Sequence, residues 1–371
     1  MKKTFLLAAS ILSLSAGLTL AESPKQDSKE EVEVVFVLDS TGSMGGLIEG
    51  AKQKIWSIAN GIIARKPSPN VRFGLVSYRD KGDEYVSKVF DLTDDLDTVF
   101  KNLQSFNAMG GGDGPESVNQ ALNEAVMKIS WSKNAKTVKT VFLVGDYPPH
   151  MDYKDDVKYQ VSCQEAAKNN IVINTVQCGN NSATTPVWQE IARLAEGSYI
   201  ALEQSGGMNA ITTPYDEEMA KLSTELNKTV VSYGSKRQQA DVAEKKAYAA
   251  AAPEVAASRA TFNAMAGGKA IQGRGDLVSD LKDGYAKLET LKEEELPDEL
   301  KKMSADERTT YIAKQQSLRA ELNKKQEELA RKRSEFIEQE KKRLSSTGKG
   351  DAFDLKVNEM INSQAERMKS K

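Results

Sequence analysis

Three oxygen-bearing side chains stand at alternating positions in the segment DSTGSM, which covers residues 39–44. Asp39, Thr41 and Ser43 directly follow the apolar run VEVVFVL and directly precede a long helical pattern. One interpretation is a polar turn between a strand and a helix, in which Ser and Thr cap the next helix. The other is a cation site, because hard divalent cations take oxygen ligands of these kinds.

A second acid, Asp146, ends another apolar run, TVFLVGD. In an open parallel sheet, ligands bind beyond the carboxyl ends of the strands, where the strand order reverses. If these two runs are the neighbouring strands at that point, Asp39 and Asp146 face one crevice. The glycine-rich loop NAMGGGDGPES, which carries Asp113, is expected at the same edge. These carboxylates would repel one another, and a divalent cation would remove the repulsion.

The alternation of apolar runs and helical patterns predicts the elements that carry these residues. Helical spacing predicts helices over 47–62 and 118–129, with further helical stretches around 154–168 and 185–196. Strands are predicted for VEVVFVL, VRFGLVSY, VSKVFDL, TVFLVGD, IVINTVQC and SYIAL, the third as an antiparallel edge. We therefore predict an α/β fold with a Rossmann-like, doubly wound, mostly parallel six-stranded sheet and helices on both faces, followed by an all-α C-terminal extension.

An apolar strand followed by D-x-[ST]-x-S, within this βαβ order, resembles the metal-ion-dependent adhesion site of von Willebrand factor A domains. The resemblance covers about half of the chain. It implies that Asp39, Thr41 and Ser43 are ion ligands and that Asp146 is the acid from the later strand, often acting through water. The family usually places a threonine in the intervening loop, where this chain has GGGDGPE. Asp113 is the predicted ligand there, with water as the alternative.

The donor oxygens also set the expected ion. Carboxylates and hydroxyls without His or Cys point to Mg²⁺, with Mn²⁺ or Ca²⁺ as alternatives, and away from zinc. The motifs SYRD at 77–80 and DYPPH at 146–150 are similar to a bacterial branch of the same family. For Arg79, Asp80 and His150 the sequence leaves two roles open, a structural role or a place around the ion ligands.

The N-terminus is typical of an export signal. Lys2 and Lys3 precede the apolar stretch TFLLAASILSLSAGLTLA. Small residues favour cleavage after Ala21, so a signal peptide is predicted over 1–21, with an uncleaved anchor as the alternative. A polar linker over 22–30 would follow. We expect an exported protein, most simply in the periplasm, with secretion or envelope association as alternatives.

Export changes how the only two cysteines are interpreted. Cys163 lies near the start of the predicted helix CQEAAKNN, and Cys178 ends the predicted strand IVINTVQC. A helix that leads into a strand runs back across the sheet, so its start and the strand's far end lie at one edge. We predict a disulfide between them, with two unpaired, partly buried thiols as the alternative.

The α/β region is predicted over 31–204, and no strand is predicted after it. The rest is expected to comprise a closing or connecting helix, an Ala/Gly-rich linker region and a helical, partly coiled-coil-like tail, over 205–240, 241–275 and 276–371. The tail would begin with the helix DLVSDLKDGYAKLETLKEEEL. Ser304 and Glu307 then have the spacing of a capping box for a longer helix. Its narrow apolar stripe indicates a helical hairpin or a helix packed on a partner.

The composition and the motifs together favour a binding module over an enzyme. A net charge of −2 gives no signal for nucleic-acid binding. The resemblance implies an adhesion-type module of the bacterial cell envelope, which captures an Asp or Glu of a partner protein through the ion. A metal-assisted hydrolase is one alternative, although GGGDG lacks the Gly-Lys-Ser/Thr of a phosphate-binding loop. The other is a scaffold that acts through its C-terminal helices, by partner contact or self-association.

Overall fold

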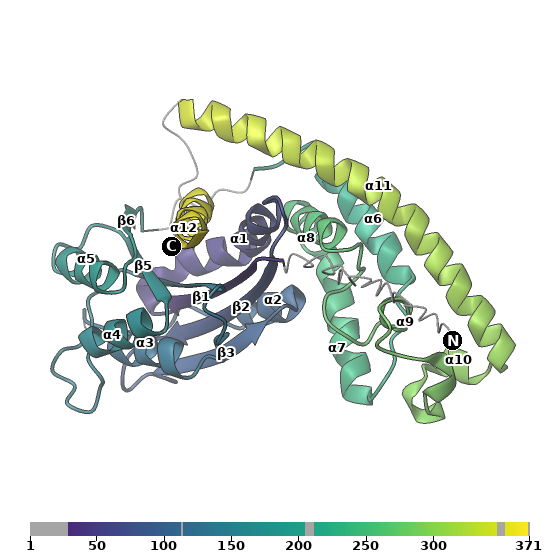
Figure 1. Cartoon of the computed structure of the whole chain (residues 1–371), viewed down its shortest axis with the longest axis horizontal. Coiled ribbons are helices and arrows are strands. Elements are labelled where there is room, and N and C mark those ends of the chain that lie inside the picture. Colours follow the sequence, from purple (N-terminus) through teal and green to yellow (C-terminus); the bar gives the residue numbers. More distant parts are fainter. Residues whose placement is uncertain (1–28, 113, 205–210, 347–352, 370–371) are drawn as a thin grey trace, which may run out of the picture.

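A six-stranded sheet occupies the centre of the N-terminal part of the chain, in the order β3-β2-β1-β4-β5-β6 (Figure 1). The computed structural model describes residues 29–112, 114–204, 211–346 and 353–369. The strands are β1 (Glu31–Asp39), β2 (Asn70–Tyr78), β3 (Ser87–Thr93), β4 (Val138–Gly145), β5 (Ile171–Cys178) and β6 (Tyr199–Leu202). All neighbouring pairs are parallel except β2 and β3. The strand order reverses at β1, which confirms the predicted doubly wound fold.

Both faces of the sheet are covered by helices, which explains why its central strands are continuously apolar. Val34, Phe36 and Leu38 of β1 point into one core, and Val35 and Val37 point into the other. The first core is closed by α1 (Gly45–Ile63), α2 (Leu96–Gln104) and α12 (Phe353–Lys369). The second is closed by α3 (Val118–Met127), α4 (Tyr159–Lys168) and α5 (Thr184–Leu194).

The two cysteines lie on opposite faces of this sheet. Cys178, the last residue of β5, belongs to the core beneath α1, whereas Cys163 of α4 belongs to the core on the other face. Both are buried and free, and the Cys163 thiol donates to the Ile191 carbonyl oxygen at 3.7 Å. The predicted disulfide is therefore wrong. The order of helix and strand places both residues at one edge but does not fix the face of the sheet to which Cys178 points.

The chain between β6 and α12 forms a second, helical part beside the sheet (Figure 1). Its helices are α6 (Asp216–Lys228), α7 (Lys236–Ala247), α8 (Pro253–Met265), α9 (Leu277–Lys282), α10 (Asp298–Lys301) and α11 (Ala305–Ser346). Aromatic contacts attach this part to the α/β domain: the ring centroid of Trp56 in α1 lies 5.6 Å from that of Phe262, and that of Phe100 lies 5.1 Å from that of Tyr248.

Much of the predicted linker over 241–275 is instead a packed helix, α8, which lies between α1, α6 and α11. Its Arg259 forms a fully buried, two-point ion pair with Asp97 of α2, at 2.6 and 2.7 Å. The Ala-rich composition is therefore not a sign of flexibility here. Small side chains let α8 approach its neighbours closely, and Ala256, Ala257 and Ala260 are all buried.

The longest helix, α11, begins as predicted. The Ser304 backbone N–H donates to Glu307 Oε2 at 2.7 Å, and the Glu307 N–H donates to Ser304 Oγ at 3.3 Å, which is a capping box. Leu329 and Ala330 bury the middle of α11 against α6 and α8. The helix predicted before it is shorter than expected, because α9 ends at Lys282 and 3₁₀ turns follow.

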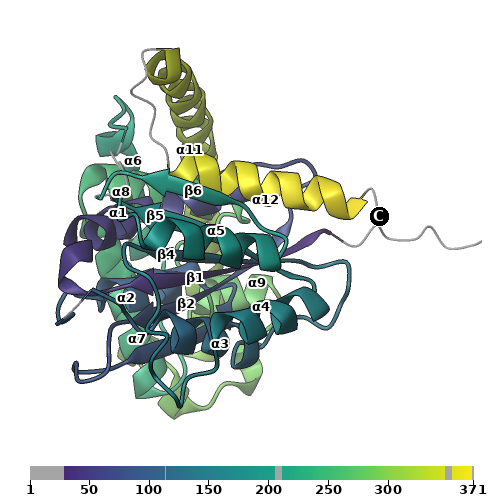
Figure 2. The ribbon, with the colours of Figure 1, turned by 90° about the vertical axis from the view of Figure 1, so that its left-hand side faces the viewer.

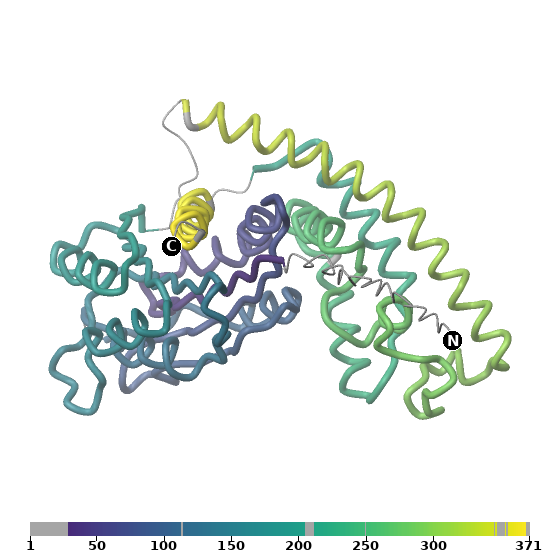
Figure 3. The backbone as a smooth tube through the Cα atoms, in the orientation of Figure 1, coloured from purple at the N-terminus to yellow at the C-terminus, as the bar shows by residue number. Residues whose placement is uncertain are grey.

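The final helix, α12, returns to the sheet instead of continuing a coiled-coil-like tail. The smooth trace in Figure 3 shows the chain leaving the α/β domain after β6, forming the helical part and coming back. Phe353, Val357 and Ile361 of α12 join the core beneath α1, and Gln364 Nε2 donates to the Lys139 carbonyl oxygen of β4 at 2.9 Å. Figure 2 shows α12 lying next to β6. The α/β domain is therefore completed by residues far from it in sequence.

In the parts of the chain that the structure describes, no helix has both the length and the apolar character needed to span a bilayer. The predicted signal peptide over 1–21 lies outside these parts. Of the predicted linker over 22–30, only residues 29 and 30 are described.

Candidate metal centre at the carboxyl edge of the sheet

Two acids end neighbouring parallel strands at the point where the strand order reverses. Asp39 is the last residue of β1, and Asp146 directly follows β4. The register pairs Leu38 with Val144, which places the two acids side by side. Gly145 makes this approach feasible, because a Cβ there would lie 3.1 Å from both the Cβ and Oδ2 of Asp39. The predicted pairing of these two strands is confirmed.

The residues of DSTGSM arrange the Asp39 carboxylate and do not cap the following helix. Thr41 donates to Asp39 Oδ1 twice, from its backbone N–H at 2.9 Å and from Oγ1 at 2.6 Å. Thr41 Oγ1 lies 3.4 Å from the Oγ of the exposed Ser43. Neither the 3₁₀ turn over Gly42–Met44 nor α1 has a side-chain cap at its start. The simple capping turn is therefore not what the structure shows.

Glu116, which the sequence argument missed, is the third acid of the site. It precedes α3 and is buried. A Cβ at Gly111 would lie 3.1 Å from Glu116 Oε1 and 3.2 Å from Thr41 Cβ, so both residues border one small space. Glu116 is also fixed by its backbone: its N–H donates to the Pro148 carbonyl, and its own carbonyl accepts from the His150 N–H, both at 3.0 Å.

The electrostatics of this edge disfavour three ionised acids in the absence of a cation. Burial raises the pKa of the Asp39 carboxyl to about 7, against the opposing effect of the Thr41 hydrogen bond and with further help from the charge on Asp146. Burial likewise raises the pKa of the Glu116 carboxyl to about 9, and the nearby charges of Asp39, Asp80 and Asp146 add to it.

Each of the three buried acids leaves one oxygen without a hydrogen-bond partner among the described residues: Asp39 Oδ2, Glu116 Oε2 and Asp146 Oδ1. Buried carboxylate oxygens are normally satisfied, so three such atoms at one edge fit a cation that would bind them. Within the described ranges, no group of three or more His, Cys, Asp and Glu side chains is arranged to hold a metal ion by itself. Hydroxyl or water oxygens would have to complete the coordination.

Gln204, just after β6, is a second residue that the sequence argument missed. Its Nε2 donates to Asp146 Oδ2 at 2.7 Å and lies 3.4 Å from the Ser43 carbonyl oxygen. Thr184 at the start of α5 donates to the Asp146 backbone carbonyl at 2.8 Å. These contacts hold Asp146 in place and leave Oδ1 available. Neither residue carries a local motif, whereas Glu116 lies within the glycine-rich loop NAMGGGDGPES, where its charge is a signal visible in the sequence.

The loops around the site are braced by the residues whose roles the sequence left open. Arg79 donates to the Ser40 carbonyl oxygen at 3.3 Å and to that of Asn107 at 2.7 Å. Asp80 accepts from Tyr153 at 2.9 Å and from Ser117 at 3.0 Å. Both residues therefore have structural roles beside the site.

His150 lies among acids. Its Nδ1 is 2.8 Å from Asp152 Oδ1, and its Nε2 is 3.4 Å from Asp80 Oδ2. The ring stacks on Tyr153 with a centroid distance of 4.1 Å. The predicted loop ligand Asp113 lies outside the described residues.

The comparisons with known proteins concern this α/β part. Residues 33–213 match the family model described as von Willebrand factor A domain. The von Willebrand factor A domain-containing protein 7 of Homo sapiens is 38% identical over 94 residues, which are 25% of this chain and 10% of that protein. The alpha-protein kinase vwkA of Dictyostelium discoideum is 26% identical over 133 residues, 33% of this chain and 19% of the kinase. The chain thus spans about a fifth or less of the length of these relatives.

Two solved structures each align with about half of the chain. The crystal structure of the SpRpn10 VWA domain is 18% identical with a TM-score of 0.36, and the alignment covers 47% of this chain and 89% of that one. An aerotolerance-related membrane protein from Bacteroides fragilis is 16% identical with a TM-score of 0.32, covering 47% of this chain and 92% of that one.

Proposed function

We propose that the chain is a metal-dependent protein-binding module, because residues 33–213 match the family model of the von Willebrand factor A domain. The observation that carries this proposal is the group of three unsatisfied carboxyl oxygens, one each on Asp39, Glu116 and Asp146. Mg²⁺ is the proposed ion, with Mn²⁺ and Ca²⁺ as alternatives, since all the donors are oxygens. Glu116 is the proposed ligand in place of the family's loop threonine, and Asp113 remains an alternative.

The residues of the site would prepare this edge for a partner. Thr41 holds Asp39 Oδ1 and so directs Oδ2 to the site, while Gln204 does the same for Asp146 by holding its Oδ2. Ser43 is exposed and offers its hydroxyl at the surface. The ion, when bound, would neutralise part of the acidic charge and would accept an Asp or Glu carboxylate of a partner protein at a vacant position.

We propose binding and not catalysis, with a metal-assisted hydrolase as the alternative. The one histidine of the sequence, His150, faces Asp152 and Asp80, so its ring nitrogens are directed at acids of the protein.

We also propose that the protein is exported and works in the bacterial envelope. The helical part would brace the domain or bring a second contact, because buried pairs such as Arg259–Asp97 fix it to the α/β domain.

Titration calorimetry with Mg²⁺ and Mn²⁺ tests the metal site directly. We expect saturable one-site binding to the wild-type chain and no detectable binding to Asp39→Asn or Asp146→Asn. Asp155→Asn is the matched control, since Asp155 is an exposed acid that pairs with Lys81 at 2.6 Å, and it should bind as wild type does. Equal binding by all four proteins would refute the site.

Affinity capture from a bacterial envelope extract then tests the partner. The same partner should be retained in Mg²⁺ and released by EDTA, and Asp39→Asn should not retain it. Turnover of phosphate esters that disappears in Asp39→Asn would instead favour the hydrolase. Capture that survives both EDTA and Asp39→Asn would show that binding does not pass through the metal site.

A further inference from the structure

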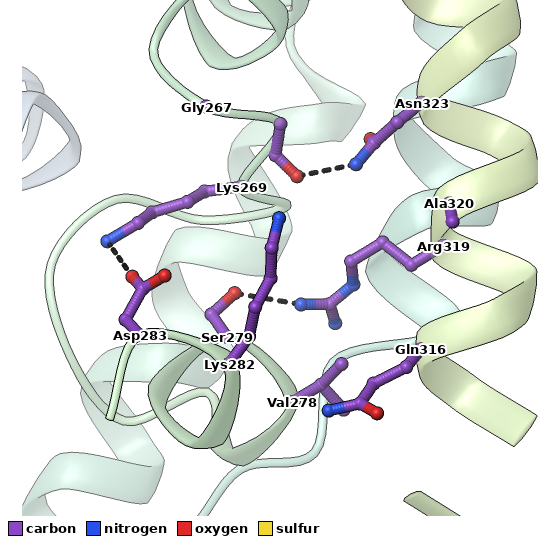
Figure 4. A pocket seen from close by; sticks show the side chains of 11 residues that line it. Gly267, Lys269, Val278, Ser279, Lys282, Asp283, Gln316, Arg319, Ala320 and Asn323 are labelled. Atoms are coloured by element: carbon purple, nitrogen blue, oxygen red, sulfur yellow. Dashed lines mark hydrogen bonds and ion pairs between the residues drawn. The ribbon is translucent and has the colours of Figure 1, made fainter. Parts of the chain in front are cut away.

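A cavity of about 460 Å³ lies in the helical part, between α9, α11 and the turn that follows α8 (Figure 4). It is separate from the carboxyl edge of the sheet, and none of the proposed ion ligands lines it. Its volume falls within the range of about 300–1,000 Å³ that is typical of small-molecule sites. The lining includes Lys269, Val278, Lys282, Gln316, Arg319 and Asn323.

Two glycines form the wall of the cavity at the end of α8. Gly267 and Gly268 have φ angles of +98° and +73°, and the Gly268 N–H donates to the Asn263 carbonyl oxygen at 2.8 Å, closing the helix end. A Cβ added at Gly267 would have no atom within 4 Å, so the space beside this residue is open. Asn323 of α11 donates to the Gly268 carbonyl oxygen at 2.7 Å, which holds α11 against this turn.

Arg319 forms a fixed part of the cavity wall, and its guanidinium is not available to a ligand. Its guanidinium is buried and donates to the Asp276 carboxylate, to Ser279 Oγ at 2.9 Å and to the Thr229 carbonyl oxygen at 2.7 Å. Asp276 also caps α9 by accepting from the Val278 N–H at 3.3 Å. These bonds fix α9 on α11 and so give the cavity a defined shape.

The remaining cations are Lys269 and Lys282. Lys269 pairs with Asp283 at 3.0 Å. Lys282 extends between Asp283 and Arg319 with its ammonium group directed toward the glycine turn (Figure 4). Within the described part of the chain, no ion pair or hydrogen bond engages that ammonium group. The lining therefore carries three cations and one acid, with an amide from Gln316.

We propose that this cavity binds a small organic anion. Lys282, which is exposed, would hold its carboxylate or phosphate group with the assistance of Lys269 and Gln316, because a hydrogen bond from an ammonium group to an oxyanion is stronger than one between neutral groups. Val278 and the exposed Ala320 would contact the apolar body of the ligand. A bare inorganic ion would leave most of the cavity unfilled. Binding would also strengthen the junction of α9 and α11, since a ligand that binds only the folded state stabilises it.

Titration calorimetry on the whole chain, with benzoate, its neutral isostere benzamide and phenyl phosphate, tests this proposal. We expect benzoate or phenyl phosphate to bind at least fivefold more tightly than benzamide, and their ranking separates a carboxylate from a phosphate preference. Lys282→Met keeps the stem and removes the charge, and it should weaken anion binding about tenfold. Lys314→Met, an exposed position of α11 outside the cavity, is the matched control and should have no effect.

A second variant separates loss of the cavity from loss of the charge. Ala320→Leu would fill the space from an exposed helix position, and it should abolish binding while Lys282 remains. The proposal is overturned if no probe binds, if benzoate and phenyl phosphate bind no better than benzamide, if Lys282→Met and Lys314→Met behave alike, or if Ala320→Leu still binds. Circular dichroism of each variant would confirm that it is folded.

Discussion

Asp39 and Asp146 lie side by side at the switch point of the sheet, although 106 residues separate them in the chain. They reach this position because β1 and β4 are adjacent parallel strands that end at the same level. Glu116 adds a third buried acid, so the edge of the sheet concentrates negative charge in a poorly solvated space. This repulsion is the physical reason for expecting a cation. The predictions on pH, on Mg²⁺ and on Glu116→Gln test it.

The stability of the protein without a cation should fall as the pH rises. The folded pKa of Asp39 is raised from 3.8 to about 7, and that of Glu116 from 4.5 to about 9. Both groups therefore hold their protons more tightly in the folded state, and the loss of stability develops from about pH 4 up to about pH 9. Urea unfolding at several pH values in EDTA would measure it.

Mg²⁺ should reverse this trend, since ion binding favours the ionised acids and releases protons. The stabilisation by Mg²⁺ should thus grow with pH and be small at pH 5. A stability that is the same with EDTA and Mg²⁺ at pH 8, or that rises with pH in EDTA, would contradict the assignment of these acids.

Glu116→Gln should separate the charge of this residue from its shape. The amide removes one of three negative charges, so Mg²⁺ affinity should drop by about tenfold or more. In EDTA the variant should be more stable than wild type at pH 8, because a buried neutral group carries no ionisation penalty. Glu84→Gln, at an exposed acid of the same edge, is the control. Unchanged Mg²⁺ affinity in Glu116→Gln would exclude Glu116 as a ligand.

Gly145→Ala should damage the site by sterics alone. The new Cβ would lie 2.4 Å from the Tyr78 hydroxyl oxygen, and Tyr78 is fully buried and cannot move aside. We expect a destabilisation of about 1–3 kcal/mol and weaker Mg²⁺ binding, as the Asp39 carboxylate is displaced. At Gly112, nothing lies within 4 Å of an added Cβ, so Gly112→Ala should change neither quantity. Equal Mg²⁺ affinity in both variants would show that the spacing of the strands is not critical.

Phe353→Ala should destabilise the α/β domain even though Phe353 lies near the end of the chain. Its ring is buried, and its centroid lies 6.5 Å from that of Phe36 in β1. Large-to-small changes of this kind cost about 3–5 kcal/mol. Lys356→Ala, at an exposed position of the same helix, should cost less than about 0.5 kcal/mol. Denaturant unfolding compares the two, and similar small losses would mean that α12 is not part of the core.

Arg259→Met should loosen the contact between the helical part and the α/β domain. It leaves the fully buried Asp97 carboxylate without its partner, which typically costs about 3–5 kcal/mol. The double variant Arg259→Met/Asp97→Asn should recover much of this loss, because no unpaired charge remains. Denaturant unfolding of the double-mutant cycle measures the coupling. A purely additive result would show that the pair contributes no direct stabilisation.

Much of the fold could be predicted from the sequence because its signals are local. Continuous apolar runs such as 32–38 are typical of strands covered on both faces, and Ser304 with Glu307 begins α11 as predicted. The wrong predictions concern long-range packing. Small residues of α8 looked like a linker, and α12 looked like part of a coiled-coil-like tail. Both are buried by contacts with segments far away in sequence, and no local pattern reports such contacts.

The sequence by itself determined the strand–helix alternation, the switch point and the acids that follow β1 and β4, because side-chain type and periodicity dictate these features. Only the tertiary structure decided that Cys163 and Cys178 face opposite cores, that Gln204 supports Asp146, and that Glu116 is the third acid of the site. The physical reason is that burial and the direction of a side chain depend on which distant segments meet. Which distant segments come into contact is set by the packing of the whole chain.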